Sequence, residues 1–363
     1  GIQTQALALA KEYKQKGAII YFFWTSRYEE DFVNRELLAN NFKILDGRFI
    51  KSIFWSKYSW RLHRYIPIIK ASLIVRFYGF DYIIPYQNDL SYFFGTIHNY
   101  TGAKMTIFHI RNTVIENNPK LKWHLKKALK NQPIIITNSN HARLKFKKLY
   151  GGIYNLDIHT IYNGIEIRKI DISKDWKAFF GVNEYDFIVT SIANFFAEKD
   201  YETLFKAWQL FLERTNSNSI LIIAGDEGKK GKMDFYKKKV KELRIANNVK
   251  FLGRISYNIE LLNITNVNVL STLNEGLPNV VIETLGVRKP FTGTNVDGVR
   301  EVVGENYPIP LFNVGDFNEL SNIIFSVYKS EYDISHVRNY SIERFKLFSI
   351  SNLINNYNNI LEI

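Results

Sequence analysis

The chain has 363 residues, of which 46% are hydrophobic and 15% are aromatic. This composition excludes an intrinsically disordered chain, and the length is too great for one ordinary hydrophobic core, so we expect two globular domains. The sequence contains no cysteine, which excludes a disulfide framework and thiolate zinc sites and fits a reducing compartment.

The positive charge is concentrated in the first half of the chain. Residues 1–165 hold 24 Lys and Arg against 10 Asp and Glu, a balance of +14, whereas residues 166–363 hold 24 against 25, a balance of −1. This asymmetry indicates an anionic partner for the first half, either a membrane surface or a nucleic acid. The alternative is an ordinary solvated surface in a protein from a basic proteome.

The first half predicts a mixed α/β domain. A helix that ends at Gly17 precedes an apolar run at 18–24, and further runs typical of buried strands follow at 81–86, 103–110 and 132–139. A Rossmann-like half normally opens with a strand and a Gly-rich turn. Because this sequence opens with a helix, we expect that a first strand is missing from it.

Strands and helices alternate through the second half. Short β-branched runs, several of them separated by helical patterns, lie at 186–193, 219–226, 248–253, 267–271 and 289–294. This alternation predicts parallel βαβ units, and the continuous apolar strands predict a sheet that is covered on both faces.

A turn signal, Asn163-Gly164, marks the boundary between the halves. We therefore predict an N-terminal domain at 1–165, a second domain at 166–345, and a terminal helix at 346–363 that packs back on the first domain. No apolar run approaches the roughly 20 residues that a membrane-spanning helix needs, and the first residues lack the pattern of a signal peptide, so we expect a cytoplasmic protein.

The segment EGLPNVVIE, residues 275–283, holds two carboxylates in an otherwise apolar stretch. An ionised Glu is rarely left in such a segment unless it makes hydrogen bonds. Pro278 suits the first turn of a helix, which places Glu275 in the preceding loop and Glu283 about a turn and a half along. Both could face a phosphate-bearing ligand at the helix N-terminus.

This segment resembles the E-x7-E motif of family 4 retaining glycosyltransferases of GT-B fold. The segments SxxNEGLPNVVIETL and KPFTGTNVDGVREVV carry the strongest likeness, supported by YETLFKAW, LIIAGDEG, NNVKFLGRI and IYNGIE. The resemblance covers nearly the whole chain. It implies an α/β protein with two Rossmann-like domains facing a central cleft, the second of which binds a nucleotide-sugar donor.

The resemblance assigns the second domain's donor-binding residues. Glu283 would accept two hydrogen bonds from a ribose diol, and Glu275 would hold hydroxyls of the donor sugar. The diphosphate would lie against the start of the helix, formed by Gly276, Leu277, Pro278, Asn279 and Val280. The structural alternatives are an ordinary loop acid at 275 and a solvated helix position at 283.

The resemblance also implies that Lys199 stabilises the charge of the leaving diphosphate. The alternative interpretation is that Lys199 is an ordinary surface lysine in a turn. Five residues earlier the chain has Asn194, where the family usually has an Arg that also grips the phosphates. Arg254, Arg300 or the helix terminus could compensate for that lost charge. Gly298 would permit a close backbone approach in the loop before the last donor-domain helix.

In the first domain, the resemblance places His109 near the reacting sugar. Its alternative is a histidine with satisfied hydrogen bonds at the end of a strand. The sequence has no HExxH, CxxC or D-x-D pattern, so we predict no metal and no cofactor beyond a UDP- or GDP-linked sugar substrate.

Two basic segments of the first half are candidates for membrane contact. Residues 48–79 interleave Arg and Lys with aromatic and aliphatic residues, and residues 119–130 place Leu121, Leu125 and Leu129 on one helical side among five lysines. Such composition is typical of interfacial helices, and the alternative is ordinary packing onto a sheet. We rank nucleic acid below an anionic membrane, since no recognisable nucleic-acid module is present.

The sequence as a whole predicts a cytoplasmic, peripherally membrane-bound transferase. It would move a hexose or N-acetylhexosamine, with retention, from a nucleotide sugar to a glycan or lipid-linked acceptor in surface polysaccharide or lipopolysaccharide biosynthesis. Two alternatives remain open, a GT-B-like nucleotide-sugar epimerase and a non-catalytic nucleotide-sugar- or glycan-binding relative.

Overall fold

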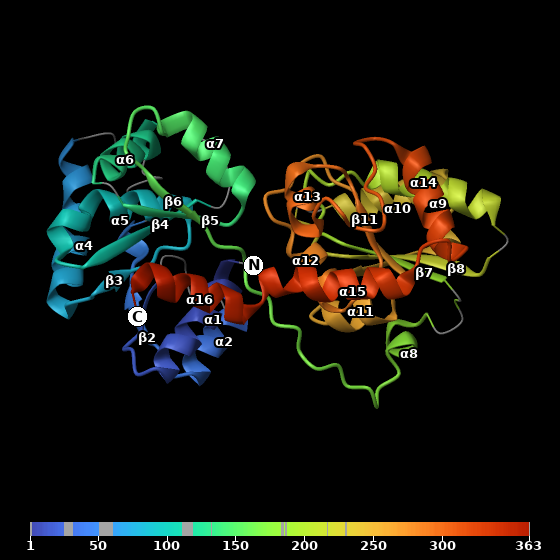
Figure 1. Ribbon diagram of the computed structural model, residues 1–363, viewed down its shortest axis with the longest axis horizontal. Helices are drawn as coiled ribbons and strands as arrows, with labels where there is room; N and C mark the ends of the chain where they lie inside the picture. Colours follow the sequence, from blue (N-terminus) through green and yellow to red (C-terminus); the bar gives the residue numbers. More distant parts are fainter. Residues whose placement is uncertain are drawn as a thin grey trace. The chain divides into compact units, whose positions relative to one another are not determined.

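The chain folds as two compact units in the computed structural model (Figure 1). The structure describes residues 2–24, 32–50, 61–110, 119–131, 133–182, 185, 187–215, 217–228 and 231–362. Unit 1 comprises Gly1–Asn163 together with Leu353–Ile363, and unit 2 comprises Gly164–Asn352. The division falls two residues before the predicted boundary, and the chain returns to unit 1 at Leu353 rather than at residue 346.

Unit 1 contains parallel strands with helices between them. Its strands are β1 (Tyr21–Trp24), β2 (Lys43–Asp46), β3 (Tyr82–Ile83), β4 (Met105–Ile110), β5 (Ile134–Thr137) and β6 (Asp157–Thr160). Its described helices are α1 (Ile2–Gln15), α2 (Phe32–Ala39), α4 (Arg61–Tyr78), α5 (Asn88–Thr101), α6 (Pro119–Lys130), α7 (Asn140–Tyr150) and α16 (Ile350–Leu361).

The described strands of unit 1 form two separate sheets. β1 pairs with β2, and the other four strands pair in the order β3-β4-β5-β6, all in parallel. Within the described ranges no backbone ladder joins the two sheets. The expectation of a further strand ahead of the first helix stays a prediction.

The terminal helix α16 is held in unit 1 by polar side chains. The Tyr13 hydroxyl donates to Asn358 Oδ1 over 3.1 Å, and the Tyr82 hydroxyl donates to the Leu361 carbonyl over 3.2 Å. Tyr357 is 1% exposed, and its hydroxyl lies 2.5 Å from His109 Nε2. Each of these three residues of unit 1 binds a different residue of the helix, so the second half of α16 is fixed on unit 1.

Unit 2 is built on one five-stranded parallel sheet. Its strands are β7 (Phe187–Ile192), β8 (Ser219–Ala224), β9 (Val249–Gly253), β10 (Val267–Leu270) and β11 (Phe291–Gly293), in the order β11-β10-β7-β8-β9. Its helices are α8 (Trp176–Phe180), α9 (Tyr201–Arg214), α10 (Lys232–Glu242), α11 (Asn258–Ile264), α12 (Asn279–Gly286), α13 (Asp297–Val303), α14 (Phe317–Tyr328) and α15 (Ile334–Phe345).

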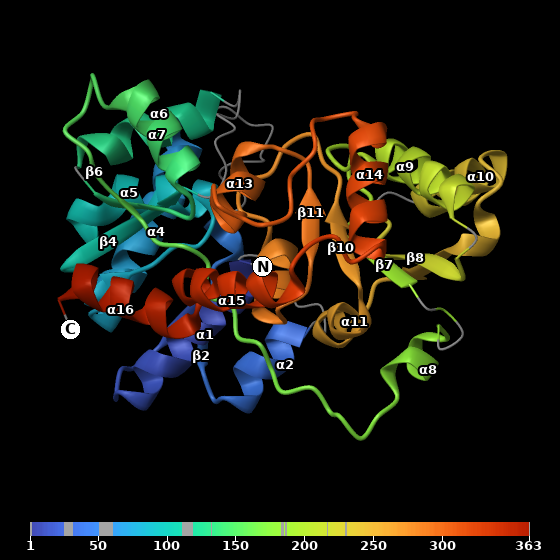
Figure 2. The ribbon, with the colours of Figure 1, turned by 45° about the vertical axis from the view of Figure 1, so that its right-hand side comes forward.

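Both faces of this sheet are covered, as the continuous apolar strands predict. Successive residues of a strand point to opposite faces, so Phe187 and Val189 pack into a core with α9, α10 and α14, whereas Ile188 packs with α8 and α11. Figure 2 shows α9, α10 and α14 on one side of the sheet and α11 on the other. The α/β prediction with two Rossmann-like domains is confirmed.

The strand order of unit 2 fixes where a ligand can bind. From β7 the chain moves outward through β8 and β9, then returns to the other side of β7 for β10 and β11. In open α/β sheets, ligands bind outside the carboxyl ends of the strands where the order reverses. That point is between β7 and β10, and the loops that leave these two strands are therefore the place to look for function.

Close backbone packing at the end of β8 gives a test of this arrangement. A Cβ atom added at Gly225 would lie 2.0 Å from the carbonyl oxygen of Ala193, which is the residue after β7. We expect Gly225→Ala to lower the free energy of unfolding by about 1–3 kcal/mol, because backbone atoms must move apart. Urea unfolding followed by circular dichroism measures the change.

Gly152→Ala is the matched control, because a Cβ atom at Gly152 would have no heavy atom within 4 Å. It should leave the unfolding midpoint almost unchanged. Equal midpoints for the two variants would show that the ends of β7 and β8 are less tightly packed than the structure indicates.

Candidate functional site

The loops after β7 and β10 are joined by hydrogen bonds at the strand-order reversal. The Leu273 amide donates to the Glu198 carbonyl over 2.7 Å, and the Asp200 amide donates to the Ser271 carbonyl over 3.1 Å. Lys199 and Thr272 form a β-bridge between these two contacts. The two loops therefore behave as a short two-stranded unit, and side chains along it have fixed positions.

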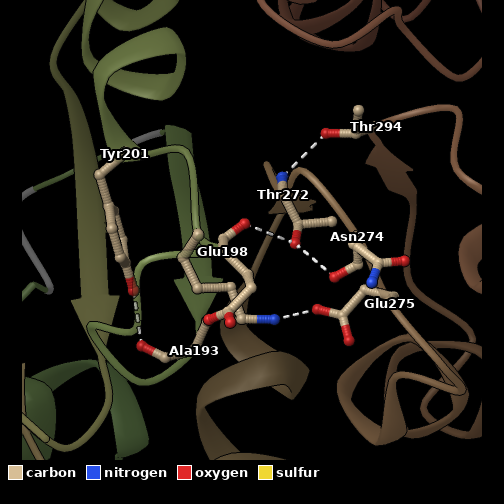
Figure 3. A network of polar contacts seen from close by, with 8 residues as sticks. Ala193, Glu198, Tyr201, Thr272, Asn274, Glu275 and Thr294 are labelled. Carbon is tan, nitrogen blue, oxygen red and sulfur yellow. Dashed lines mark hydrogen bonds and ion pairs between the residues drawn. The ribbon is translucent and has the colours of Figure 1, made fainter. Parts of the chain in front are cut away.

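Thr272 extends this connection to a third strand. Its amide donates to Thr294 Oγ1 over 2.9 Å, directly after β11, and its own hydroxyl lies 2.9 Å from the Glu198 carbonyl (Figure 3). Thr272 is fully buried. One threonine thus links the carboxyl ends of β7, β10 and β11.

The predicted catalytic residues Lys199 and Glu275 lie against each other in this loop pair. The Lys199 ammonium donates to Glu275 Oε1, and the two side chains are 15% and 14% exposed (Figure 3). Burial removes water from both groups, so each depends on the other for compensation of its charge. An anionic ligand that reaches this point can take the place of Glu275 as the partner of Lys199.

The helix α12 begins next to this pair. Pro278 is its N-cap and Asn279 its first residue, so the proline lies one position earlier than the sequence predicts. The amides of Gly276, Leu277 and Val280 donate to no residue in the described part of the chain. Such N–H groups at a helix start are suited to bind an anion, here adjacent to the Lys199–Glu275 pair.

Glu283 lies on α12, just over one turn from its start, and is half-buried. Burial raises the pKa of its carboxyl group to about 7, and a hydrogen bond from the Asn258 side chain and the charge of Arg168 partly oppose that rise. Arg168 also pairs with the buried Glu260 over 3.3 Å. Burial disfavours the ionised form of this carboxyl group, and hydrogen bonds from the hydroxyls of a ligand would stabilise that form.

Asn194 occupies the loop after β7 and binds backbone rather than presenting a charge. Its side-chain Oδ1 accepts a hydrogen bond from the Asp226 amide over 2.8 Å, and the adjacent Phe195 amide donates to the Asp226 carbonyl over 3.0 Å. Asn194 therefore ties the end of β7 to the end of β8. An arginine at this position could not accept that hydrogen bond.

The two arginines considered as substitutes differ in availability. Arg300 is held by an ion pair with Asp297 and by a 3.0 Å hydrogen bond to Asn295 Oδ1. Arg254 is exposed directly after β9, and it pairs with no acidic residue in the described ranges. Of these two side chains, Arg254 is the one free to meet a phosphate.

A buried polar network beneath the site was not predicted from the sequence. Asn268 of β10 accepts from the Thr190 hydroxyl of β7 over 3.1 Å and donates to the Thr284 hydroxyl of α12 over 2.9 Å. All three residues are fully buried. Because each hydrogen bond links a different element, the network fixes α12 against the two strands that carry the site.

Gly298, at the start of α13, allows the close approach expected of it. A Cβ atom there would lie 2.5 Å from the carbonyl oxygens of both Glu275 and Gly276. Any larger residue would displace the loop that carries Glu275.

His109 does not have the open position that the sequence predicts for it. The residue is 1% exposed, with Nδ1 2.5 Å from the Pro85 carbonyl and Nε2 2.5 Å from the Tyr357 hydroxyl. Both ring nitrogens are engaged inside unit 1, which corrects the expectation of a side chain that faces the reacting sugar. We do not include His109 in the candidate site.

The described residues hold no cluster of three or more His, Cys, Asp or Glu side chains placed to bind a metal ion.

Residues 173–344, most of unit 2, match the family model described as "Glycosyl transferases group 1". N-acetyl-alpha-D-glucosaminyl L-malate synthase from Bacillus anthracis is 25% identical over 60% of this chain and 56% of its own length. The putative glycosyltransferase EpsD from Bacillus subtilis is 29% identical over 41% of this chain and 38% of its own length. The chain thus spans about half the length, or less, of these two relatives.

Solved structures match over the entire chain. HepE from Anabaena, in complex with UDP and glucose, is 18% identical with a TM-score of 0.79, covering 100% of this chain and 96% of HepE. The apo lipopolysaccharide outer core galactosyltransferase WaaB is 15% identical with a TM-score of 0.70, covering 99% of this chain and 95% of WaaB. The fold is GT-B.

Because the pKa of Glu283 is raised in this GT-B protein, we predict that replacing this residue stabilises the fold by an amount that depends on pH. The folded-state pKa is about 7 against a usual value of 4.5, so the folded state loses stability as the pH rises through that window. We expect Glu283→Gln to raise the free energy of unfolding at pH 8 by roughly 1–3 kcal/mol, and to change it little at pH 4.5. Urea unfolding at both pH values measures the difference.

Glu305→Gln is the control, because Glu305 is exposed. It should have the same small effect at both pH values. A Glu283→Gln effect that does not change with pH would contradict a carboxyl group that titrates near neutrality.

Proposed function

We propose that this protein is a retaining glycosyltransferase that moves a hexose or N-acetylhexosamine from a nucleoside-diphosphate sugar to a glycan or lipid-linked acceptor. The observation that carries the proposal is the Lys199–Glu275 pair beside the start of α12, with Glu283 just over one turn along that helix. The amides of Gly276, Leu277 and Val280 at this start donate to no described residue. In such a donor, Lys199 and the helix start would bind the phosphates, Glu275 would bind the sugar, and Glu283 would bind the ribose.

The donor replaces contacts that unit 2 makes internally. Its diphosphate binds the amides at the start of α12 and attracts the Lys199 ammonium, which then leaves Glu275. Glu275 is freed to accept hydrogen bonds from hydroxyls of the donor sugar. Glu283 accepts from the ribose diol, and these hydrogen bonds favour its ionised form.

Transfer then needs charge stabilisation more than proton-transfer groups. The bond between the anomeric carbon and the phosphate oxygen breaks, the acceptor oxygen bonds to that carbon on the same face, and the acceptor proton goes to the departing phosphate. Negative charge grows on the diphosphate as the bond breaks, and Lys199 stabilises it in a site where side chains are mostly buried.

The sugar and the pathway are inferred from relatives. The Bacillus anthracis relative is named for an N-acetylglucosaminyl reaction, which keeps N-acetylhexosamine beside hexose. The likeness to EpsD at 29% identity supports a glycosyltransferase. Assembly of surface polysaccharide or lipopolysaccharide, and a cytoplasmic location, stay predictions from the sequence.

A non-catalytic nucleotide-sugar-binding protein is the second candidate, favoured by Asn194. This residue contributes no charge to the phosphates and binds the Asp226 amide instead. The two candidates share donor binding and differ in turnover, so one set of variants separates them.

We expect UDP- or GDP-sugars to raise the melting temperature of the chain, because a ligand that binds only the folded state stabilises it. Glu283→Ala should weaken this binding about tenfold or more through loss of two hydrogen bonds. Lys199→Met should lower turnover by about a hundredfold or more, with a smaller loss of affinity, because its charge acts mainly in the transition state. Calorimetry and release of free nucleotide measure the two effects.

Glu305→Ala, an exposed glutamate outside the site, should bind and turn over like the unchanged chain. Donor binding with neither transfer nor hydrolysis would favour the non-catalytic candidate. Failure of every UDP- and GDP-sugar to stabilise the chain would contradict both.

A further inference from the structure

The helix α4 is labelled in unit 1 in Figure 1. It carries a row of large apolar side chains that the described part of the chain leaves exposed. Ile66, Ile69, Leu73 and Phe77 are 59%, 56%, 62% and 83% exposed. Single exposed apolar residues are ordinary on a protein surface, whereas a contiguous row of four marks an interaction site. At the end of the row, Leu73 and Phe77 also line a surface concavity.

The positions of these four residues place them together on the outward face of α4. At 100° per residue, the four side chains fall within an arc of about 80° and span about 16 Å of helix. Ile68, Ala71 and Val75 occupy the opposite face and are buried in the core of unit 1. The helix therefore has one apolar face for the core and a second that faces outward.

Positive charge borders the outward row on both sides. By the same helical geometry, Lys70 lies about 20° beyond one edge of the row and Arg76 about 20° beyond the other, and both are exposed. Residues 47–80 contain seven Lys or Arg and no Asp or Glu. Asp81, the next acid along the chain, is neutralised by Lys104 over 2.8 Å.

The second predicted membrane segment has the opposite arrangement. Leu125 and Leu129 of α6 are 4% and 0% exposed and belong to the core of unit 1, and the side chain of Leu121 lies outside the described ones. Leu125 and Leu129 pack into the core of unit 1 and cannot enter a bilayer, so the prediction that they form an interfacial face on α6 is wrong. The row on α4 has the exposure that α6 lacks.

We propose that α4 is a membrane-docking helix, which inserts Ile66, Ile69, Leu73 and Phe77 into the interface of an anionic bilayer while Lys70 and Arg76 contact lipid phosphates. The apolar row supplies the hydrophobic term and the flanking cations supply the electrostatic one. A second copy fits less well, because a symmetric contact would bring the cations of two helices together without an acid on either. This inference goes beyond the proposed function and does not depend on it.

Vesicle flotation tests the proposal with the full chain. Vesicles of equal parts phosphatidylglycerol and phosphatidylcholine should bind the protein, pure phosphatidylcholine vesicles should bind it several-fold less, and binding should fall as salt is raised. The double substitution Leu73→Ser with Phe77→Ser should weaken binding to the anionic vesicles about tenfold, because it removes two apolar side chains from the interface.

Two further variants separate the hydrophobic term from charge and from general surface effects. Arg76→Glu should weaken binding to the anionic vesicles about tenfold and leave binding to neutral vesicles unchanged. Phe235→Ser is the matched control, because Phe235 is 49% exposed on α10 of unit 2, and its binding should equal that of the unchanged chain. Equal melting temperatures confirm that the variants are folded.

Unchanged vesicle binding by the double variant, or no binding by the original chain, overturns the proposal. The proposal is also overturned if light scattering shows a dimer of the original chain, the double variant is a monomer, and neither binds vesicles. The row would then join two copies of the chain. Donor-induced stabilisation in unit 2 is measured in parallel, so that a failure of membrane docking is distinguished from a failure of the proposed function.

Discussion

Hydrogen bonds between the loops after β7 and β10 are the constraint on which the candidate site depends. The strand order reverses between these two strands. Beyond their carboxyl ends, the Leu273–Glu198 and Asp200–Ser271 hydrogen bonds join the two loops. Lys199 lies between the two contacts and is thereby held against Glu275. If the loops separated, the cation and the carboxylate would return to water, and the start of α12 would lose its charged neighbours.

The site contains charged side chains that a ligand could bind. Lys199 and Glu275 satisfy each other, whereas Glu283 is held in surroundings that disfavour its ionised form. A folded core without a function would replace such groups by apolar ones, because a half-compensated buried charge lowers stability. The fully hydrogen-bonded network of Thr190, Asn268 and Thr284 lies directly beneath and fixes α12. A rigid support for α12 and polar groups that a ligand can engage are the arrangement expected of a preorganised binding site.

The sequence predicts the fold better than it predicts the direction of side chains. Continuous β-branched runs identify all the strands that the structure describes in unit 2, and the carboxylates at 275 and 283 stand out because their neighbours are apolar. His109 also follows apolar strand residues, but only the packing of α16 reveals that the Tyr357 hydroxyl contacts its Nε2 atom. Asn268 was missed because a polar residue within a strand gives no sign of which partners reach it. Helical periodicity likewise finds an apolar face on α6 without showing that this face meets the core.

The uneven charge of the two halves fits the two binding surfaces that we propose. Unit 2 can hold an anion through short-range contacts, one lysine and the amides of a helix, so the balance of −1 over residues 166–363 is no obstacle. The +14 of residues 1–165 suits a partner of its own in the proposed membrane docking, an anionic surface whose attraction is screened by salt. A row of apolar side chains bordered by cations on α4 is where such a long-range attraction and a short-range hydrophobic contact coincide.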